Sequence, residues 1–209
     1  MKRYAPYLWI TAAVMLLGGK CGSDADNPAD PDPVDGIETN HTDPAAAVAA
    51  WAEALEAREI DPVIALLDPA FVYHMRDDDA DQFPWLPPGQ GWSHAVEIGI
   101  LRNMMDPNFI SEETNNPVLE IHMELVVTAT QELPDGSVEI TTNADALVLW
   151  GPGDGASTVG RFTFRLAPDA DGFYRILSQR ELPPFNRGAA SSVEAATWGG
   201  IKSLYRNGN

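Results

Sequence analysis

Tyr73 and His74 are neighbouring residues whose side chains could carry acid–base chemistry. A phenol or an imidazole can give or take a proton during a reaction when a second group fixes its orientation and tunes its pKa. No such second group has a fixed sequence relation to this pair. We therefore expect no catalytic residue beyond these two candidates, and a lone histidine at the end of a strand-like run more often lies at the surface.

Metal chemistry has one partial signature. Asp77, Asp79 and Asp81 have the 1, 3, 5 spacing of a calcium-binding loop, but Gln82 stands where such loops carry glycine and Pro88 where they carry glutamate. The chain also has no glycine-rich phosphate loop, HExxH pair, CxxC pair or nucleophile elbow. We predict no metal site and no cofactor, and hydrolysis by serine or cysteine has no positive support.

Cys21 is the only cysteine, so no disulfide can form within the chain. It follows a basic start and an apolar run over residues 8–19, which is too short to span a bilayer. Residues 1–21 resemble a bacterial lipoprotein signal, and this resemblance implies lipidation of Cys21 and cleavage before it. Lys20 departs from the small residue usual at that position, so ordinary secretion and a retained signal anchor remain alternatives. The prediction is an exported, lipid-anchored protein of the bacterial cell envelope, at the outer membrane or cell surface.

Residues 22–43 contain seven acids, no bases and several prolines. Few of them could enter a core, so we predict a disordered acidic tether that holds a folded domain away from the membrane. The whole chain has 31 acidic and 13 basic residues, a net charge of −18. Such a charge repels phosphates, and we expect no nucleic-acid partner.

The first part of the predicted domain reads as helical. An acid precedes a proline at 43–44 and at 61–62, which is typical of a helix start, and apolar residues such as Val48, Trp51 and Leu55 follow at helical spacing. Ser93 can cap a third helix that runs to about Met105, with a broad apolar arc.

After residue 117 the apolar spacing changes from about 3.6 to two. Alternating runs over 119–127, 138–150, 161–166 and 173–182 are separated by turn sequences, which predicts four antiparallel strands with one solvated face. The fold class is therefore α+β: three N-terminal helices in the concave face of a curved antiparallel sheet. Residues 183–209 form a C-terminal extension with a short helix.

This plan resembles the nuclear transport factor 2-like superfamily, which includes polyketide cyclase-like and ketosteroid isomerase-like proteins. The residues that carry the resemblance lie between 44 and 182: Ala49, Trp51, Leu55, Asp61, Leu66, Leu67, Phe71, Tyr73 and the closing strand from Gly172 to Ile176. The resemblance implies a cone with a pocket between sheet and helices. It also implies that an enzyme of this kind would place an Asp, His or Tyr inside the cone.

The predicted inner face of the cone is apolar and aromatic, which would suit a small apolar ligand. Its predicted lining residues are Trp51, Tyr73, Met104, Met123, Val148 and Trp150. A filled hydrophobic core is the alternative. The predicted outer face carries a ladder of opposite charges and, by the resemblance, could form a homodimer; its members are Glu120, His122, Glu124, Glu139, Asp145, Arg161, Arg165 and Arg175.

Two further segments are too apolar to be plain linkers. The loop over 76–91 with its end at Trp92 contains Phe83, Trp85 and Leu86, which predicts a flap over the cone's mouth or an exposed contact patch. In the C-terminal extension, Ser191 and Glu194 are spaced as a capping box before the helical pattern Trp198, Ile201, Leu204 and Tyr205. That helix either docks on the domain or binds a partner.

The leading interpretation is a non-catalytic envelope lipoprotein whose cone binds a small apolar ligand or only supports the fold. A protein-interaction module of an envelope complex is one alternative. An isomerase, dehydratase or cyclase that uses the cone is another, and it depends on fold analogy alone.

Overall fold

The computed structural model describes residues 36–76, 86, 91–151, 154–183 and 194–206. Cys21, Asp77, Asp79, Asp81 and Ser191, together with the loop aromatics Phe83 and Trp85, lie outside these residues. One unit starts at Gly36 and contains the helices and strands of the described residues. Among the described residues, no helix combines the length and apolarity needed to cross a membrane.

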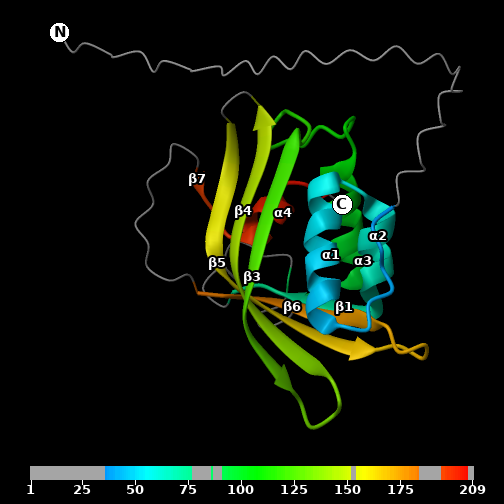
Figure 1. The fold of residues 1–209 in the computed structure, drawn as a ribbon. Coiled ribbons are helices and arrows are strands. Elements are labelled where there is room, and N and C mark those ends of the chain that lie inside the picture. The colour runs from blue at the N-terminus through cyan, green and yellow to red at the C-terminus, as the bar shows by residue number, and fades with distance from the viewer. Residues whose placement is uncertain (1–35, 77–85, 87–90, 152–153, 184–193, 207–209) are drawn as a thin grey trace, which may run out of the picture. The chain divides into compact units, whose positions relative to one another are not determined.

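Helices α1 (Pro44–Ala57) and α2 (Ile60–Leu66) form as a helical pair at the start of the unit (Figure 1). The Asp43 carboxylate accepts a hydrogen bond from the Ala45 N–H, as predicted for a capping acid. Arg58 then ends α1 in the left-handed region, at φ 58°. The predicted start of the second helix was wrong by two residues. Glu59, not Asp61, is the residue before α2, and Asp61 lies inside the first turn of the helix.

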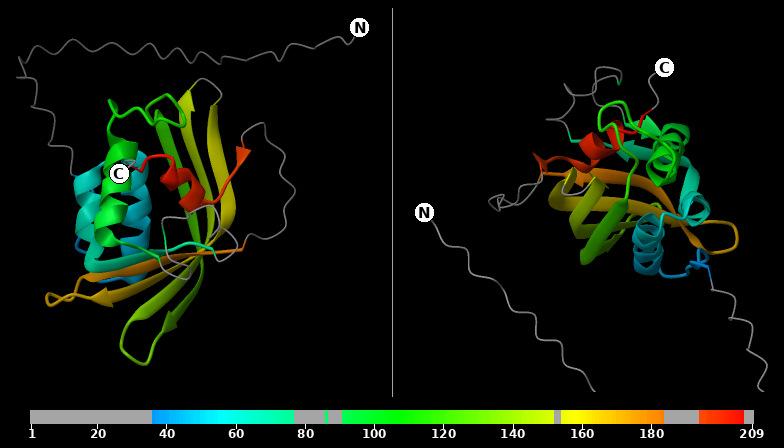
Figure 2. Two further views of the ribbon diagram at one scale, coloured as in Figure 1. Left: turned by 180° about the vertical axis from the view of Figure 1, so that it is seen from behind. Right: turned by 90° about the horizontal axis from the view of Figure 1, so that it is seen from above.

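Helix α3 (His94–Met105) follows Ser93 as predicted, and α4 (Trp198–Ser203) is the short C-terminal helix. Thr197 caps α4 by accepting a hydrogen bond from the Gly200 N–H. Figure 2 shows α4, in red, on the same side of the sheet as α3. The C-terminal helix therefore docks on the domain.

The sheet contains seven strands in the described residues. They are β1 (Leu67–His74), β2 (Trp92–Ser93), β3 (Glu120–Glu132), β4 (Val138–Gly151), β5 (Asp154–Pro168), β6 (Tyr174–Leu182) and β7 (Glu194–Ala195). Their order is β2-β1-β6-β5-β4-β3, and β7 pairs with β5. Strands β3 to β6 form the predicted antiparallel meander, while β1 runs parallel to β6. The predicted α+β fold, with helices packed on a curved sheet, is confirmed (Figure 1).

The segment before α1 also contacts this unit. The Tyr174 N–H donates to the His41 carbonyl at 2.8 Å, and the Arg175 guanidinium donates to the Thr39 carbonyl at 2.7 Å. The last part of the range that we predicted as tether thus lies against β6.

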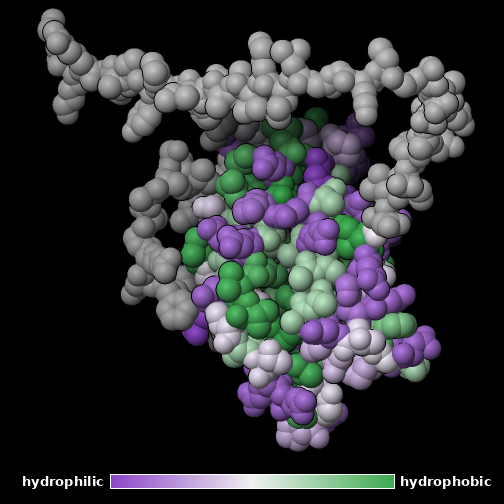
Figure 3. Space-filling view, in the orientation of Figure 1, coloured by the Kyte–Doolittle hydropathy of each residue, from purple (hydrophilic) through white to green (hydrophobic). Residues whose placement is uncertain are grey.

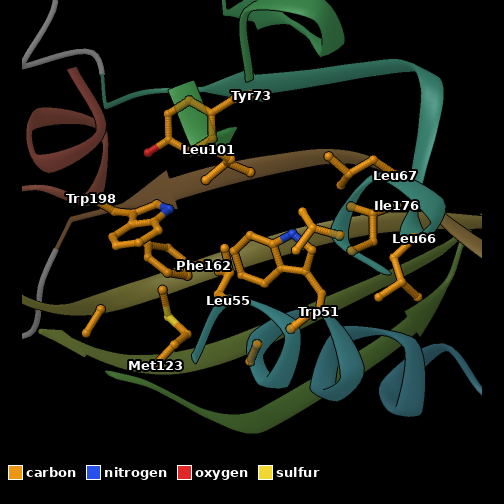
Figure 4. Close-up of a cluster of buried hydrophobic side chains, with 14 of the residues drawn as sticks. Trp51, Leu55, Leu66, Leu67, Tyr73, Leu101, Met123, Phe162, Ile176 and Trp198 are labelled. Atoms are coloured by element: carbon orange, nitrogen blue, oxygen red, sulfur yellow. The ribbon is translucent and has the colours of Figure 1, made fainter. Parts of the chain in front are cut away.

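The core fills the space between the helices and the concave face of the sheet (Figure 4). Trp51 and Leu55 of α1 are almost fully buried, and the Trp51 ring packs edge-on against Phe164 of β5 with centroids 5.5 Å apart. Burying a leucine or phenylalanine side chain stabilises the fold by about 1.5–3 kcal/mol. This cluster therefore supplies much of the stability that holds α1 on the sheet.

The outer face differs from the predicted ladder. Glu139 does lie opposite Arg165, but Glu124 lies opposite Asp145, which is a pair of like charges. His122 pairs with Glu56 of α1, with 2.7 Å between Nδ1 and Oε1, rather than with a neighbouring strand.

Arg165 and Arg175 of that face form ion pairs with turn residues and not with residues of a neighbouring strand. Arg165 pairs with Asp135 in the β3–β4 turn, and Arg175 pairs with Asp169 in the β5–β6 turn. Val126 and Val159 stand among these polar residues and are about half exposed. Figure 3 likewise shows apolar residues between polar ones on the face that β3 and α1 turn to the viewer. Pairing of two copies through this face stays a prediction.

Candidate functional site

Polar side chains from β1, β6, α3 and α4 meet inside the cone, and three of them are charged. Alternation along β1 turns Tyr73 inward, and alternation along β6 turns Gln179 and Glu181 inward. Glu97 comes from the first turn of α3 and Lys202 from α4. Glu97 and Lys202 are 0 % exposed and Glu181 is 4 % exposed. Fully buried charges are rare unless they are paired, so this cluster is the most unusual chemistry in the described chain.

Glu97 and Lys202 form a buried ion pair. The Lys202 ammonium lies 2.9 Å from each carboxylate oxygen of Glu97. The Trp92 indole N–H donates to Oε2 of the same carboxylate at 2.5 Å. Glu97 is thus held from two sides, by a cation and by a neutral donor.

Aromatic rings surround the Lys202 ammonium. Its nitrogen lies 3.4 Å from the centroid of the Tyr73 ring, 4.9 Å from that of Trp92 and 5.7 Å from that of Trp198. Tyr73 and Trp92 stack on each other with centroids 4.5 Å apart. A cation over an aromatic face gains about 2 kcal/mol when both are desolvated. We call Tyr73, Trp92, Trp198, Glu97 and Glu181 the ammonium cage.

Glu181 is the second carboxylate of the cage. Its oxygens accept the Tyr73 hydroxyl at 2.9 Å and the backbone N–H groups of Trp198 and Gly199 at 3.0 and 3.2 Å. An added Cβ on Gly199 would lie only 3.2 Å from the Tyr73 hydroxyl oxygen, so glycine permits this close approach. Glu181 therefore joins β6, β1 and the start of α4 through one side chain.

Burial shifts the pKa of one acidic and one basic side chain of this cluster. It raises the pKa of the Glu181 carboxyl, against the opposing effect of its hydrogen bonds and of Lys202. It lowers the pKa of the Lys202 ammonium, against the attraction of Glu97. The raised pKa means that the Glu181 carboxyl takes up a proton more readily than an exposed glutamate does.

A second polar group lies deeper in the cone. Gln179 is 0 % exposed, and neither its amide oxygen nor its amide nitrogen has a hydrogen-bond partner among the described residues. On β6 it lies opposite Tyr73 of β1 and opposite Phe164 of β5, against which Trp51 packs. The indole nitrogen of Trp51 likewise has no partner in this part of the chain. Leaving one buried polar group unsatisfied costs about 1–3 kcal/mol, so the arrangement calls for an occupant that can form hydrogen bonds.

The predicted pocket residues are mostly placed in this interior. Trp51, Tyr73, Met104, Met123 and Val148 are buried in one cluster. Trp150 is only partly buried and packs at the margin of the cluster, so it does not line the interior as fully as we expected.

The two predicted acid–base candidates are separated. Tyr73 points inward, whereas His74 follows it on the opposite face, beside Arg180, and is half-buried. Burial and, secondarily, the charge of Arg180 lower the pKa of the His74 imidazole. His74 thus cannot act on the same buried group as Tyr73.

Trp92 corrects another expectation. We placed it in an exposed flap or contact patch, but it lies in β2 and is 1 % exposed, because its ring stacks on Tyr73 and its N–H is bound by Glu97. Leu86, from the same predicted flap, packs partly buried against the core.

Sequence reasoning missed Glu97, Glu181, Lys202 and Gln179. A signal existed for Glu181 and Gln179, since both share the inward parity of β6 and lie two residues apart. Lys202 follows Trp198 by four residues, one helical turn, so it could have been assigned to the same buried face. The described residues hold no group of three or more acidic, histidine or cysteine side chains suited to a metal.

No protein-family model and no curated protein sequence matches this chain. Among solved structures, a proposed aromatic ring hydroxylase from Novosphingobium aromaticivorans is similar, with 14% identity, a TM-score of 0.51, and coverage of 69% of this chain and 87% of that chain. ActVI-ORFA from Streptomyces coelicolor has 14% identity, a TM-score of 0.47, and coverage of 66% and 92%. A nuclear transport factor 2-like protein of unknown function in nutrient uptake from Rhodospirillum rubrum has 10% identity, a TM-score of 0.46, and coverage of 68% and 99%.

These likenesses concern the fold. A protein described as nuclear transport factor 2-like is among these structural neighbours. A shared fold does not define an activity, because unrelated sites are built on the same architecture. The lipoprotein signal stays a prediction.

Proposed function

We propose that this chain is a non-catalytic binding protein of the bacterial cell envelope, attached through lipid on Cys21, whose cone interior takes a small and largely apolar ligand. The observation that carries the binding role is the buried amide of Gln179, which has no partner among the described residues and lies beside aromatic rings. Apolar sites with a few well-placed polar groups are the usual form of small-molecule sites. Gln179 would orient the ligand, while Trp51 and Phe164 would contact its apolar body.

A non-catalytic role fits the state of the acid–base groups. Tyr73 and Glu181 could exchange a proton with each other, but Glu181 already accepts three hydrogen bonds, two of them from the backbone of α4. The Lys202 ammonium covers the Tyr73 ring. A substrate could reach neither group without displacing α4.

One observation favours an enzyme as the second candidate. Tyr73 and Glu181 form a direct hydrogen bond inside the cone, and burial raises the pKa of Glu181, which is a property of general acids. An isomerase or dehydratase would require these two groups to face the substrate. Such an enzyme would need α4 to withdraw during each turnover.

The ligand can be sought with a neutral pair of probes. Benzamide and toluene have the same ring, but only benzamide can exchange hydrogen bonds with the Gln179 amide. We expect calorimetric titration of the purified chain to show benzamide binding that Gln179→Met weakens about tenfold, since one hydrogen bond contributes about 1–1.5 kcal/mol. Toluene binding should be equal in both proteins. If neither probe binds up to its solubility limit, the cone is a filled core and the binding proposal is wrong.

The proposed attachment to the cell envelope through Cys21 can be tested separately. Cys21→Ser should move the protein from the membrane fraction to the soluble fraction of an envelope preparation, because the predicted lipid is lost. Lys20→Ala, which restores a small residue before the cysteine, serves as the matched control and should stay with the membrane. Unchanged fractionation of Cys21→Ser would reject the anchor without touching the binding role.

A further inference from the structure

We propose that the ammonium cage is a binding site for the head group of an organic ammonium ion, and that Lys202 occupies it as an internal ligand. This inference rests on the proposed function, because it names the charged end of the molecule that the same cone would take. Gln179 and Tyr73 lie opposite each other on adjacent strands, so the cage and the polar group deeper in the cone adjoin.

The cage replaces the water around an ammonium group almost completely. An ammonium has three N–H donors, and the two oxygens of Glu97 lie at 2.9 Å from the Lys202 nitrogen. The face of Tyr73 covers another side at 3.4 Å, with Trp92 and Trp198 beyond it. Aromatic faces combined with carboxylates are the chemistry that recognises organic cations, and an uncharged ligand would lack the attraction between its charge and these groups.

The walls of the cage belong mainly to the cone, not to α4. Glu97, Tyr73, Trp92 and Glu181 come from α3, β1, β2 and β6, and only Trp198 and the lysine itself come from α4. These walls also hold one another. The Trp92 indole N–H is bonded to Glu97, and the Tyr73 hydroxyl to Glu181. A site whose walls are fixed without the ligand spends little free energy on ordering when the ligand enters.

Glu97 is the carboxylate that binds the cation directly, and Glu181 is a second buried carboxyl whose charge attracts the Lys202 ammonium. A free amine must still compete with Lys202, which is tethered at the site. The amine should therefore bind the unaltered protein only weakly, because the lysine is out of the cage in only a small fraction of the molecules.

The test removes the internal ligand and supplies a free one. Lys202→Ala deletes three carbons and the ammonium, so n-propylammonium is the matching probe and n-propanol its neutral counterpart. At constant ionic strength, we expect propylammonium to raise the Tm of full-length Lys202→Ala by about 5 °C near one hundred times its dissociation constant. Propanol and sodium chloride should leave that Tm unchanged, and the unaltered protein should respond to none of the three.

A second variant checks that the effect arises in the cage. Lys202→Ala combined with Glu97→Gln should lose the response to propylammonium, because the carboxylate that binds the cation is gone. Lys202→Ala combined with Glu56→Gln should keep it, since Glu56 lies on α1 outside the cage. Equal stabilisation by propylammonium and propanol, or an unchanged response in the Glu97→Gln variant, would overturn the proposal.

Failure of Lys202→Ala to fold does not prevent the test. The variant is then refolded in propylammonium, in sodium chloride and in propanol. Folding in propylammonium alone is the expected result, and failure in all three solutions overturns the proposal. A response to propylammonium without any binding of benzamide would keep the cage and reject the neutral ligand of the proposed function; the reverse result would do the opposite.

Discussion

The two ends of the cone interior are built from different chemistry. Around Trp51, Leu55 and Phe164 the helices meet the sheet through apolar contacts (Figure 4). Under α4, in contrast, the interior is formed by Glu97 and Lys202 with their aromatic neighbours. Both ends are equally closed to solvent, since these residues are at most 1 % exposed. The fold therefore does not need charges to exclude water.

The difference shows what each end contributes. Transferring an ion into a protein interior costs several kcal/mol, and well-packed apolar residues of similar volume often stabilise a fold as well or better. The apolar end thus accounts for stability. The charged end fixes which segment lies in the cone and, in our proposal, which head group it can hold, because Glu97 pairs with a cation while Glu181 bonds the backbone of α4.

The largest expected effect comes from breaking the buried ion pair on one side. Glu97→Leu should lower the free energy of unfolding by about 3–5 kcal/mol, because Lys202 is left without its carboxylate. Adding Lys202→Met to it should restore most of that loss. Urea unfolding measures both, with Arg165→Gln of the exposed Arg165–Asp135 pair as a control that changes stability by less than about 1 kcal/mol. A double variant as unstable as the single one would show that the two ends do not differ in this way.

At the apolar end, Leu55→Ala should lower the free energy of unfolding by about 3 kcal/mol, through lost burial and the space left behind. Unlike the ion pair, this loss has no partner change that repairs it. Combined with Glu97→Leu, the two losses should add to within about 0.5 kcal/mol, because Leu55 lies on α1 whereas the ion pair joins α3 to α4. Strong non-additivity in urea unfolding would mean that the two ends form one unit.

Gln179 lies between the two ends, and its replacement should change stability in the opposite direction. Gln179→Met should raise the free energy of unfolding by about 1 kcal/mol, because it removes a buried amide that has no partner in the described chain. Thermal unfolding in the absence of added ligand measures this. A clear loss of stability would show that the amide is satisfied and would weaken the binding role of Gln179.

The smallest effect concerns His74, outside the cone. Burial and Arg180 lower the pKa of its imidazole below 6.5, so the unfolded chain takes up the proton first as the pH falls. The free energy of unfolding should therefore decrease as the pH falls from about 7, until the folded form also binds the proton. His74→Gln should remove this part of the slope, as urea unfolding at pH 7.5 and 5.5 would show. An unchanged slope would place the pH dependence in other groups.

The architecture was predictable from local patterns. Helical spacing before residue 106 and two-residue spacing after residue 117 gave the helices and the meander, and parity placed Tyr73 inside. These patterns succeed because burial of an apolar stripe or face depends on residues that are close in sequence. The docking of the C-terminal helix followed in the same way from its apolar residues.

The charged end was not predictable in this manner. Glu97 lies in a helix that is buried on most sides, and nothing in its neighbourhood distinguishes it from a solvated glutamate. Its partner, Lys202, is 105 residues away, and the aromatic residues around the Lys202 ammonium come from β1, β2 and α4. The alternation of residues along β6 marked Gln179 and Glu181 as inward. The role of a polar residue at an inward position depends on its hydrogen-bond partners, however, and the sequence does not show those.

The wide separation of the paired residues has a kinetic consequence. Glu97 bonds a residue 105 positions away, and Tyr73 one 108 positions away, so these contacts close long loops in the domain. Such contacts form after the hairpins, and interactions that are missing from the folding transition state mainly slow the reverse reaction. The charges under α4 should therefore lengthen the lifetime of the folded molecule while leaving its rate of formation nearly unchanged.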